Sequence, residues 1–183
     1  MSSIPVLLTD RLRLRPFSLD DALEVQRLAG DRLVAATTLN IPHPYEDGMA
    51  QAWISSHQGE FIERKGVIFA IASKANGSLI GAIGLADMVA DHHAELGYWI
   101  GRPYWNQGFC TEAGAAVLRY AFTELNLVRV HSAHFARNGA SGRVLQKLGM
   151  RHEGSRKQHV RKWGQFEDLE VYGILKSDWQ AAK

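Results

Sequence analysis

Residues 94–135 contain, in direct succession, a strand, a glycine-containing loop, a helix and a second strand. Residues 94–100 form a short, mostly apolar run that is followed by a loop with Gly and Pro, which is typical of a strand, and 128–135 is predicted to be the second strand. Between 111 and 125 the apolar residues recur at helical spacing. This order restricts the chain to folds in which helices pack against a sheet.

Strands and helices continue on both sides of this unit. Ser18, followed three residues later by Asp21, resembles a capping box and predicts a helix to about Ala29. Asn76 and Gly77 suit a tight turn between two antiparallel strands. The other predicted strands are 11–15, 67–72, 79–85, 150–161 and 166–175, and the other predicted helices are 46–64 and 141–148. No repeat or linker interrupts them, so we expect one α/β domain over residues 1–183.

The composition excludes several classes of protein. The 183 residues are 46% hydrophobic, and a formal charge of +2 gives no strong attraction to nucleic acid or to anionic membranes. The single cysteine, Cys110, excludes an internal disulfide. Residues 1–8 do not resemble a signal peptide, and no stretch is long and apolar enough to span a bilayer. We expect a soluble, cytoplasmic monomer or homodimer without direct nucleic-acid or membrane binding.

The loop before the central helix is a candidate phosphate site. N–H groups at a helix N-terminus have no acceptor within the helix and lie at the positive end of its dipole, so the turn from Gln107 to Thr111 can bind phosphate. Gly108 would allow an anion to approach the backbone closely. Glu112 is compatible with this site because its side chain can point away. An ordinary helix start explains the same residues, and this loop alone leaves both interpretations open.

Two motifs resemble those of one enzyme family. Residues 105–113, with the triplet Thr111-Glu112-Ala113, are similar to the acetyl-CoA loop of GNAT acetyltransferases, especially the RimJ/RimL-like branch that acetylates ribosomal-protein N-termini. Residues 138–150 resemble that family's Asn-x-x-Ser helix, which ends in Lys-x-Gly and a large apolar residue. The resemblance runs from Leu8 to Trp179. Trp105 and Cys110 differ from the residues commonest at their positions in the wider family.

The resemblance implies a fold and a co-substrate. The fold would be a mixed, mostly antiparallel sheet of about seven strands, splayed between the fourth and fifth, with about four flanking helices. Acetyl-CoA would lie in the splay, with a free backbone N–H of the fourth strand holding its thioester carbonyl, and the acetyl group would pass directly to an amine. The residues expected to contact the coenzyme are Tyr98, Trp99, Ile100, Gln107, Gly108, Phe109, Cys110, Thr111, Asn138, Ser141, Arg143 and Lys147.

Acetyl transfer to an amine needs a neutral nucleophile and a proton for the leaving thiolate. Glu95, at the start of the fourth strand, is the candidate base, and a rim carboxylate or ion-pair partner is the alternative. Ser141 is the candidate to steady or protonate the thiolate, and Asn138 to bind the pantetheine arm, although both residue types are also common helix caps. Tyr172 is a further proton-donor candidate, but strand aromatics are more often core residues.

Histidines and basic residues suggest other functions, which we disfavour. His131 and His134 should lie on opposite faces of a strand and the adjacent His92 and His93 should diverge, so we expect no metal site. Cys110 is expected to be a packing residue, since direct transfer needs no thiol nucleophile. Basic side chains near the C-terminus are expected to form a solvated hairpin, although they could receive an acidic peptide or lie near ribosomal RNA. They are Arg151, Arg156, Lys157, Arg161 and Lys162.

The acceptor is the least determined part of the prediction. Resemblance to the branch favours a protein N-terminal α-amine. The alternatives are a small amine, such as a polyamine, amino acid or aminoglycoside, and a regulator that binds acyl-CoA without turnover. Arg143 and Lys147, four residues apart, could contact coenzyme phosphates or form an exposed cationic face.

Overall fold

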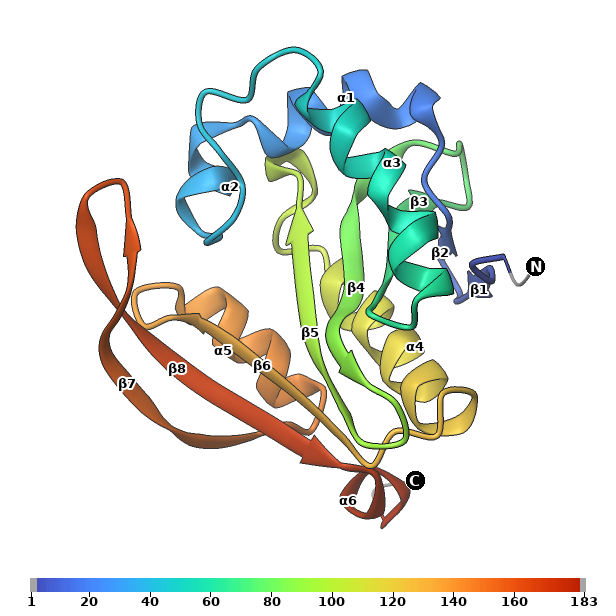
Figure 1. The fold of residues 1–183 in the computed structure, drawn as a ribbon, viewed down its shortest axis with the longest axis vertical. Helices are drawn as coiled ribbons and strands as arrows, with labels where there is room; N and C mark the ends of the chain where they lie inside the picture. Colours follow the sequence, from blue (N-terminus) through green and yellow to red (C-terminus); the bar gives the residue numbers. More distant parts are fainter. Residues whose placement is uncertain (1–2, 182–183) are drawn as a thin grey trace.

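The computed structural model describes residues 3–181, which build one eight-stranded sheet with helices on both faces (Figure 1). The strands are β1 (Leu7–Leu8), β2 (Leu12–Arg15), β3 (Val67–Ser73), β4 (Leu79–Val89), β5 (His93–Ile100), β6 (Arg129–Phe135), β7 (Arg151–Lys162) and β8 (Gln165–Leu175). The helices are α1 (Ala22–Ala29), α2 (Arg32–Ala36), α3 (Met49–Ile62), α4 (Phe109–Thr123), α5 (Gly139–Lys147) and α6 (Lys176–Ala181), with short 3-10 turns at Leu19–Asp21 and Arg102–Tyr104.

Successive side chains along the sheet pack into two separate cores, one on each face. On β3, Phe69 and Ile71 join a core with α4 and α5, whereas the intervening Ala70 joins a second core with α1 and α3. Phe69 and Ile71 are fully buried, and burying a side chain of this size contributes about 1.5–3 kcal/mol. The strand period of two therefore fixes a helix layer on each face.

The sheet opens between β5 and β6. The strand order is β1-β2-β3-β4-β5-β6-β8-β7, and only the β5–β6 pair is parallel. That pair has three registered positions, from His93 opposite Arg129 to Glu95 opposite His131. Beyond Glu95 the two strands separate, as Figure 1 shows. The expected splay between the fourth and fifth predicted strands is confirmed, because these are β5 and β6.

Several local predictions are confirmed. Ser18 and Asp21 form the capping box, and the turn before β4 places Gly77 at a φ of 76° between antiparallel strands. The mostly antiparallel sheet is also as expected. Among the described residues no helix is long and apolar enough to cross a membrane.

The expected numbers of strands and helices were too low. The described chain has eight strands and six helices because β1, α2 and α6 were not predicted. β1 has two residues and α2 has five, and elements of this length are too short to show a hydrophobic period. They form because neighbouring elements supply their packing partners.

Candidate active site

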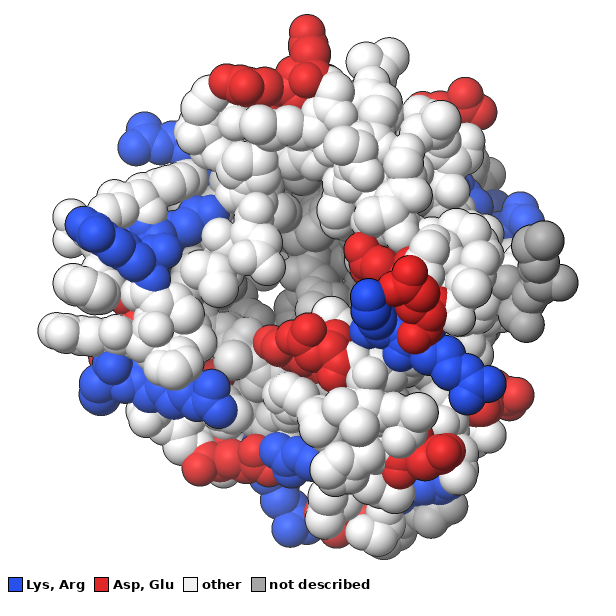
Figure 2. All heavy atoms as spheres, in the orientation of Figure 1, with Lys and Arg blue, Asp and Glu red and all other residues white. Residues whose placement is uncertain are grey.

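A cavity of about 1100 Å³ fills the opening between β5 and β6 and continues under α1, α2 and α3. Figure 2 shows it as a deep hollow in the middle of one face. On the side of α4 and α5 its lining includes Tyr98, Trp99, Ile100, Gly108, Phe109, Cys110, Thr111, Asn138, Ser141, Arg143 and Lys147. The structure therefore brings all but one of the predicted contact residues to one cleft. The exception is Gln107, which does not line it.

The start of α4 presents free backbone donors to this cleft. Gly108 caps the helix with a φ of 79°, in the left-handed region that favours glycine. Among the described residues, no hydrogen bond uses the N–H groups of residues 108–111. Four donors at the positive end of a helix dipole form a geometry that binds anions. An ordinary helix start has no need of a cavity beside its free N–H groups, so the cavity at this position favours the anion-site interpretation.

Long-range contacts hold this loop in place. The carboxylate of Glu112 accepts hydrogen bonds from the Thr9 hydroxyl (2.6 Å) and from the backbone N–H and Nε of Arg11 (2.8 and 2.7 Å). Arg11 also donates to the carbonyl of Gln107 at 3.0 Å. The Glu112 side chain thus points away from the cleft, as expected, but its partners were not predicted. The second anchor is Trp105, whose Nε1 donates to the Ile100 carbonyl at 2.7 Å.

Tyr98 and Ser141 meet across the opening. The Tyr98 hydroxyl lies 2.8 Å from Ser141 Oγ and 3.2 Å from the Ser141 carbonyl. Burial raises the pKa of Tyr98 above its ordinary value, so the hydroxyl is protonated at neutral pH. This contact places two hydroxyl groups side by side in the cleft.

The backbone of Tyr98 also faces the opening. Directly after β5, the Gly101 N–H donates to the Ile80 carbonyl of β4, whereas the Leu96 carbonyl on β5 accepts from the Ser132 hydroxyl of β6 at 2.8 Å. Backbone groups of successive strand residues point in alternate directions, so Tyr98 shares the direction of Leu96. Because pairing with β6 ends at Glu95, the Tyr98 N–H points into the cleft.

Asn138 and Ser141 differ in what they do in the fold. Asn138 is the N-cap of α5, and its side-chain oxygen accepts from the Ser141 N–H at 3.3 Å. The helix-cap interpretation, which the sequence left open for both residues, therefore holds for the side-chain oxygen of Asn138. Ser141 lies inside the helix, and its hydroxyl is turned toward Tyr98.

Glu95 lies where β5 and β6 begin to separate, and it lines the cavity together with Asp87 of β4. Burial raises the pKa of Glu95, and the nearby charge of Asp87 raises it further, while Arg156 acts in the opposite direction. A carboxylate with a raised pKa is a stronger base than an exposed one. The ion-pair alternative finds no support, since no cation of the described residues lies within salt-bridge distance of Glu95.

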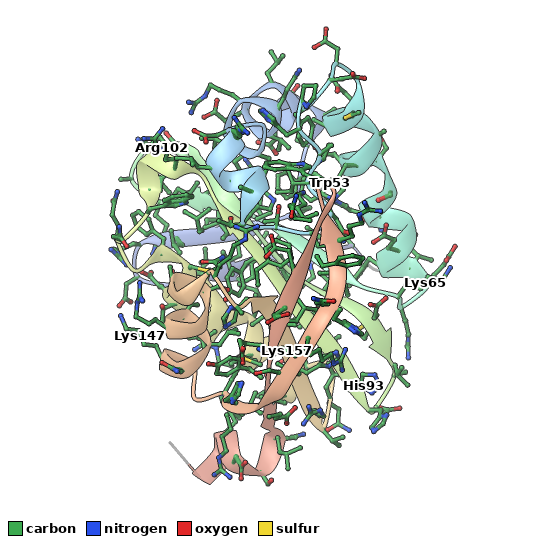
Figure 3. The ribbon with its side chains drawn as sticks, turned by 90° about the vertical axis from the view of Figure 1, so that its left-hand side faces the viewer. Trp53, Lys65, His93, Arg102, Lys147 and Lys157 are labelled. Carbon is green, nitrogen blue, oxygen red and sulfur yellow. The ribbon has the colours of Figure 1, made fainter. Side chains whose placement is uncertain are left out.

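Charge in the cavity lining is divided between two ends. The acidic residues are Asp87 and Glu95, and the basic residues are Arg143 and Lys147 on α5. Both basic side chains are exposed, and no described carboxylate pairs with them. Figure 3 shows Lys147 projecting from α5 at the edge of the molecule. Anionic groups are therefore favoured near α5 and cationic groups near Glu95.

Cys110 and Tyr172 do not occupy catalytic environments. Burial raises the pKa of the Cys110 thiol to about 12, which keeps it protonated and unreactive as a nucleophile. Tyr172 does not line the cavity. Its ring stacks on that of His134 at a centroid distance of 5.6 Å and lies tilted against that of His152 at 5.2 Å, so the core interpretation fits it.

One expectation about the histidines was wrong. His131 and His134 do lie on different faces, but the rings of His92 and His93 approach one another, with their Nδ1 atoms 3.0 Å apart. The residues lie at the end of a hairpin, where the strand alternation that would separate them breaks down. Within residues 3–181 no group of three or more His, Cys, Asp or Glu side chains is arranged to hold a metal.

The expectation of a fully solvated basic hairpin was wrong for Lys162. Its side chain is buried, with 6% exposure, and Nζ donates to the carbonyls of Leu39 and Ile41. The other four basic residues of the hairpin are exposed, as expected. The sequence could not show this difference because Leu39 lies 123 residues away.

Comparison with known proteins agrees with this geometry. Residues 11–151 match the family model described as an acetyltransferase (GNAT) domain. The chain is 32% identical over 174 residues to the Bacillus subtilis protein named "Uncharacterized N-acetyltransferase YoaA", covering 94% of this chain and 97% of YoaA. It is 29% identical over 103 residues to the [ribosomal protein uS5]-alanine N-acetyltransferase of Escherichia coli, covering 55% and 53% of the two chains.

Solved structures show the same fold. A GNAT-family acetyltransferase from Bacillus anthracis superimposes with a TM-score of 0.83 at 26% identity, covering 94% of this chain and 99% of that one. Mycobacterium smegmatis RimJ, solved in complex with CoA-disulfide, has a TM-score of 0.83 at 21% identity, covering 98% and 95%. The family match, the nearly full-length relative and the shared fold show that this chain belongs to the GNAT family of acetyltransferases.

Proposed function

We propose that this protein transfers the acetyl group of acetyl-CoA to the α-amine of a protein N-terminus in the cytoplasm. The observation that carries the proposal is the division of the cavity into a coenzyme side with free N–H donors and an acceptor side with two carboxylates and uncharged walls. The walls on the acceptor side include Val25, Ala29, Val34, Leu39, Ile41, Tyr45 and Trp53. The E. coli relative's name, which specifies a ribosomal-protein alanine, supports the same acceptor class.

The cleft fits acetyl-CoA on three features of this chain. The free N–H groups of residues 108–111 would hold the diphosphate, and Arg143 and Lys147 would face the negative charge. The Tyr98 N–H would hold the thioester carbonyl. When bound, acetyl-CoA supplies the activated acetyl group.

Three side chains would accept or hold protons during the transfer. Glu95 is positioned to accept a proton from the incoming ammonium, since it is the raised-pKa carboxylate at the opening. The hydroxyls of Ser141 and Tyr98 would steady the leaving thiolate and hold a proton beside it. An α-amine has an ordinary pKa of about 8, so a useful fraction is already neutral near pH 7.

A small amine is the second candidate acceptor. The two carboxylates, Asp87 and Glu95, are the observation in its favour, because an acidic site attracts a polycation. Against it, the rest of the acceptor wall carries no further carboxylate among the described lining residues. A polyamine would therefore leave its distant ammonium groups without partners.

A mass-spectrometric screen tests the acceptor. Purified protein and acetyl-CoA are incubated with peptides that have free N-termini, with the same peptides N-formylated, and with spermidine, free amino acids and an aminoglycoside. We expect acetylation at the α-amine of free peptides, located by fragmentation, and none on the formylated set. If spermidine or another small amine has a kcat/KM at least about tenfold above every peptide, the proposed acceptor is wrong.

A further inference from the structure

Lys162, at the end of β7, is a buried cation held by main-chain carbonyls. Its Nζ donates to the Leu39 carbonyl at 3.0 Å and to the Ile41 carbonyl at 2.7 Å. No carboxylate of the described residues forms an ion pair with it, and burial, aided by the charge of Arg137, lowers its pKa. A buried ammonium is costly unless its protons are satisfied, so these two bonds hold both partners in place.

The carbonyls belong to residues 37–42, which we call the roof segment. All six of its residues line the cavity, on the acceptor side between α2 and α3. Within the described residues, its main-chain N–H bonds end with Thr37 to Val34 and Thr38 to Ala35. The part from Leu39 to Pro42 therefore has no local hydrogen-bond ladder, and its hydrogen bonds within the described residues are the two that Lys162 donates.

Other hairpin and loop contacts surround this attachment. Arg137 donates to the Ala36 carbonyl at 2.7 Å, just before the roof segment. The Trp163 ring lies 5.9 Å from the His43 ring, just after it. In Figure 1 the tip of the β7–β8 hairpin faces α2 and the chain that follows it, and Figure 3 shows the hairpin rising toward the level of Trp53. The hairpin and roof segment thus close the acceptor side from opposite edges.

We propose that Lys162 is a specificity-determining residue, which holds the roof segment closed so that the acceptor must carry a compact, uncharged group beside its amine. This inference rests on the proposed function, because it describes the acceptor side of the same cleft. The walls fit such a group, since the side chains of the roof segment are uncharged and Val34, Tyr45 and Trp53 continue the same lining. Lys162 acts on the reaction only through the position of the roof.

The test compares Lys162→Met with Lys157→Met. Methionine keeps the apolar stem of lysine and most of its length but cannot donate to the carbonyls. Lys157 lies on the same strand, is exposed and pairs with Asp168, so its replacement controls for loss of a hairpin charge. Both variants are assayed with peptides whose first residue runs from alanine to phenylalanine to lysine, and with whichever small amine the wild type accepts best.

We expect Lys162→Met to raise KM for the preferred acceptor about tenfold and to reduce the preference for small first residues by a similar factor, with KM for acetyl-CoA unchanged. Thermolysin, which cuts before large apolar residues, should cleave before Leu39 several times faster than in the wild type, as mapped by mass spectrometry. Lys157→Met should match the wild type in every assay. If Lys162→Met does not fold, Lys162→Gln, which keeps a shorter neutral donor, should show the same changes relative to the wild type to a smaller extent.

Unchanged acceptor KM, selectivity and cleavage in a folded Lys162 variant would overturn the proposal. Equal increases in both KM values would also overturn it, because they would show a general structural role. If no peptide is acetylated but thermolysin cleavage accelerates and the KM of a small amine rises, the role of Lys162 stands and the peptide acceptor is wrong.

Discussion

The hydroxyl of Tyr98 on β5 lies 2.8 Å from the Oγ of Ser141 on α5, and this contact joins the two sides of the opened sheet. The residues are 43 positions apart in sequence. Their meeting depends on the end of β5–β6 pairing at Glu95, which leaves space for a side chain to cross.

Removing the Tyr98 hydroxyl should slow catalysis with little effect on coenzyme binding. For Tyr98→Phe and Ser141→Ala we expect kcat to fall at least about tenfold, because each loses one of two hydroxyls near the leaving thiolate. The fold-reduction in kcat of the double variant should be smaller than the product of the two single reductions, since both substitutions remove the same hydrogen bond. Steady-state kinetics measure this, with the buried Tyr120→Phe on α4 as a control that should keep wild-type kcat. Full additivity would show that the pair does not act as a unit.

Glu95→Gln should lower kcat by about 100-fold or more at neutral pH, while KM for acetyl-CoA stays within about twofold. The wild-type rate should fall on the acidic side as Glu95 becomes protonated, above the ordinary range for a glutamate because its pKa is raised. The variant should lack this limb of the pH profile. A wild-type profile retained by Glu95→Gln would exclude this carboxylate as the base.

The same substitution should stabilise the protein at neutral pH. A glutamate whose pKa is raised by folding contributes stability below its unfolded pKa and loses it as pH rises through the folded value. Glutamine carries no charge and so avoids the cost of a buried carboxylate. Glu95→Gln should therefore melt at a higher temperature than the wild type at pH 7, and the difference in melting temperature should disappear below about pH 4. Thermal melts across pH measure the difference. A lower melting temperature at pH 7 would contradict the assigned burial cost.

Gly108→Ala should weaken coenzyme binding through backbone strain. At a φ of 79° an alanine costs about 1–2 kcal/mol, and relief of this strain would turn the free donors away from the cleft. We expect KM for acetyl-CoA to rise about tenfold. Gly77→Ala is the matched control, because its φ of 76° imposes similar strain in a turn outside the cavity. Gly77→Ala should lower stability to a similar extent and leave KM for acetyl-CoA unchanged. Equal KM values for acetyl-CoA in the two variants would contradict the assignment of the Gly108 loop to coenzyme binding.

Glu112→Gln should destabilise the protein by about 1–3 kcal/mol at pH 7, since its charge-assisted hydrogen bonds to Thr9 and Arg11 would weaken. Burial acts to raise the pKa of Glu112, but these bonds outweigh it and lower the pKa. A lowered pKa gives stability above the unfolded value that is lost as pH falls through the folded value, so the difference should shrink on acidification.

Denaturant titrations at neutral pH and near pH 3 measure this difference. The exposed Glu46, which pairs with no cation of the described residues, provides the control Glu46→Gln, whose stability should equal that of the wild type. A constant gap between Glu112→Gln and the wild type at both pH values would show that ionisation of Glu112 is not the source of the stability.

Much of the fold follows from local patterns. The capping box at Ser18, the turn at Gly77 and the helix start at Gly108 each depend on residues within a few positions of one another. Coenzyme contact by the residues lining the cleft stays a prediction, although their convergence on one cavity is observed. The missed elements, β1 and α2, are too short for a hydrophobic period to identify.

The sequence alone determined where strands and helices form and that a turn at Gly108 would leave N–H groups free, because φ preferences and helix-end geometry are local properties. Only the tertiary structure decided which distant groups meet. The bonds from Arg11 to Glu112 span 101 residues and those from Lys162 to Leu39 span 123, and both depend on sheet register and hairpin length. A lysine in a basic run has the same local pattern whether it is solvated or buried, so its burial follows from the packing of the hairpin against the roof segment.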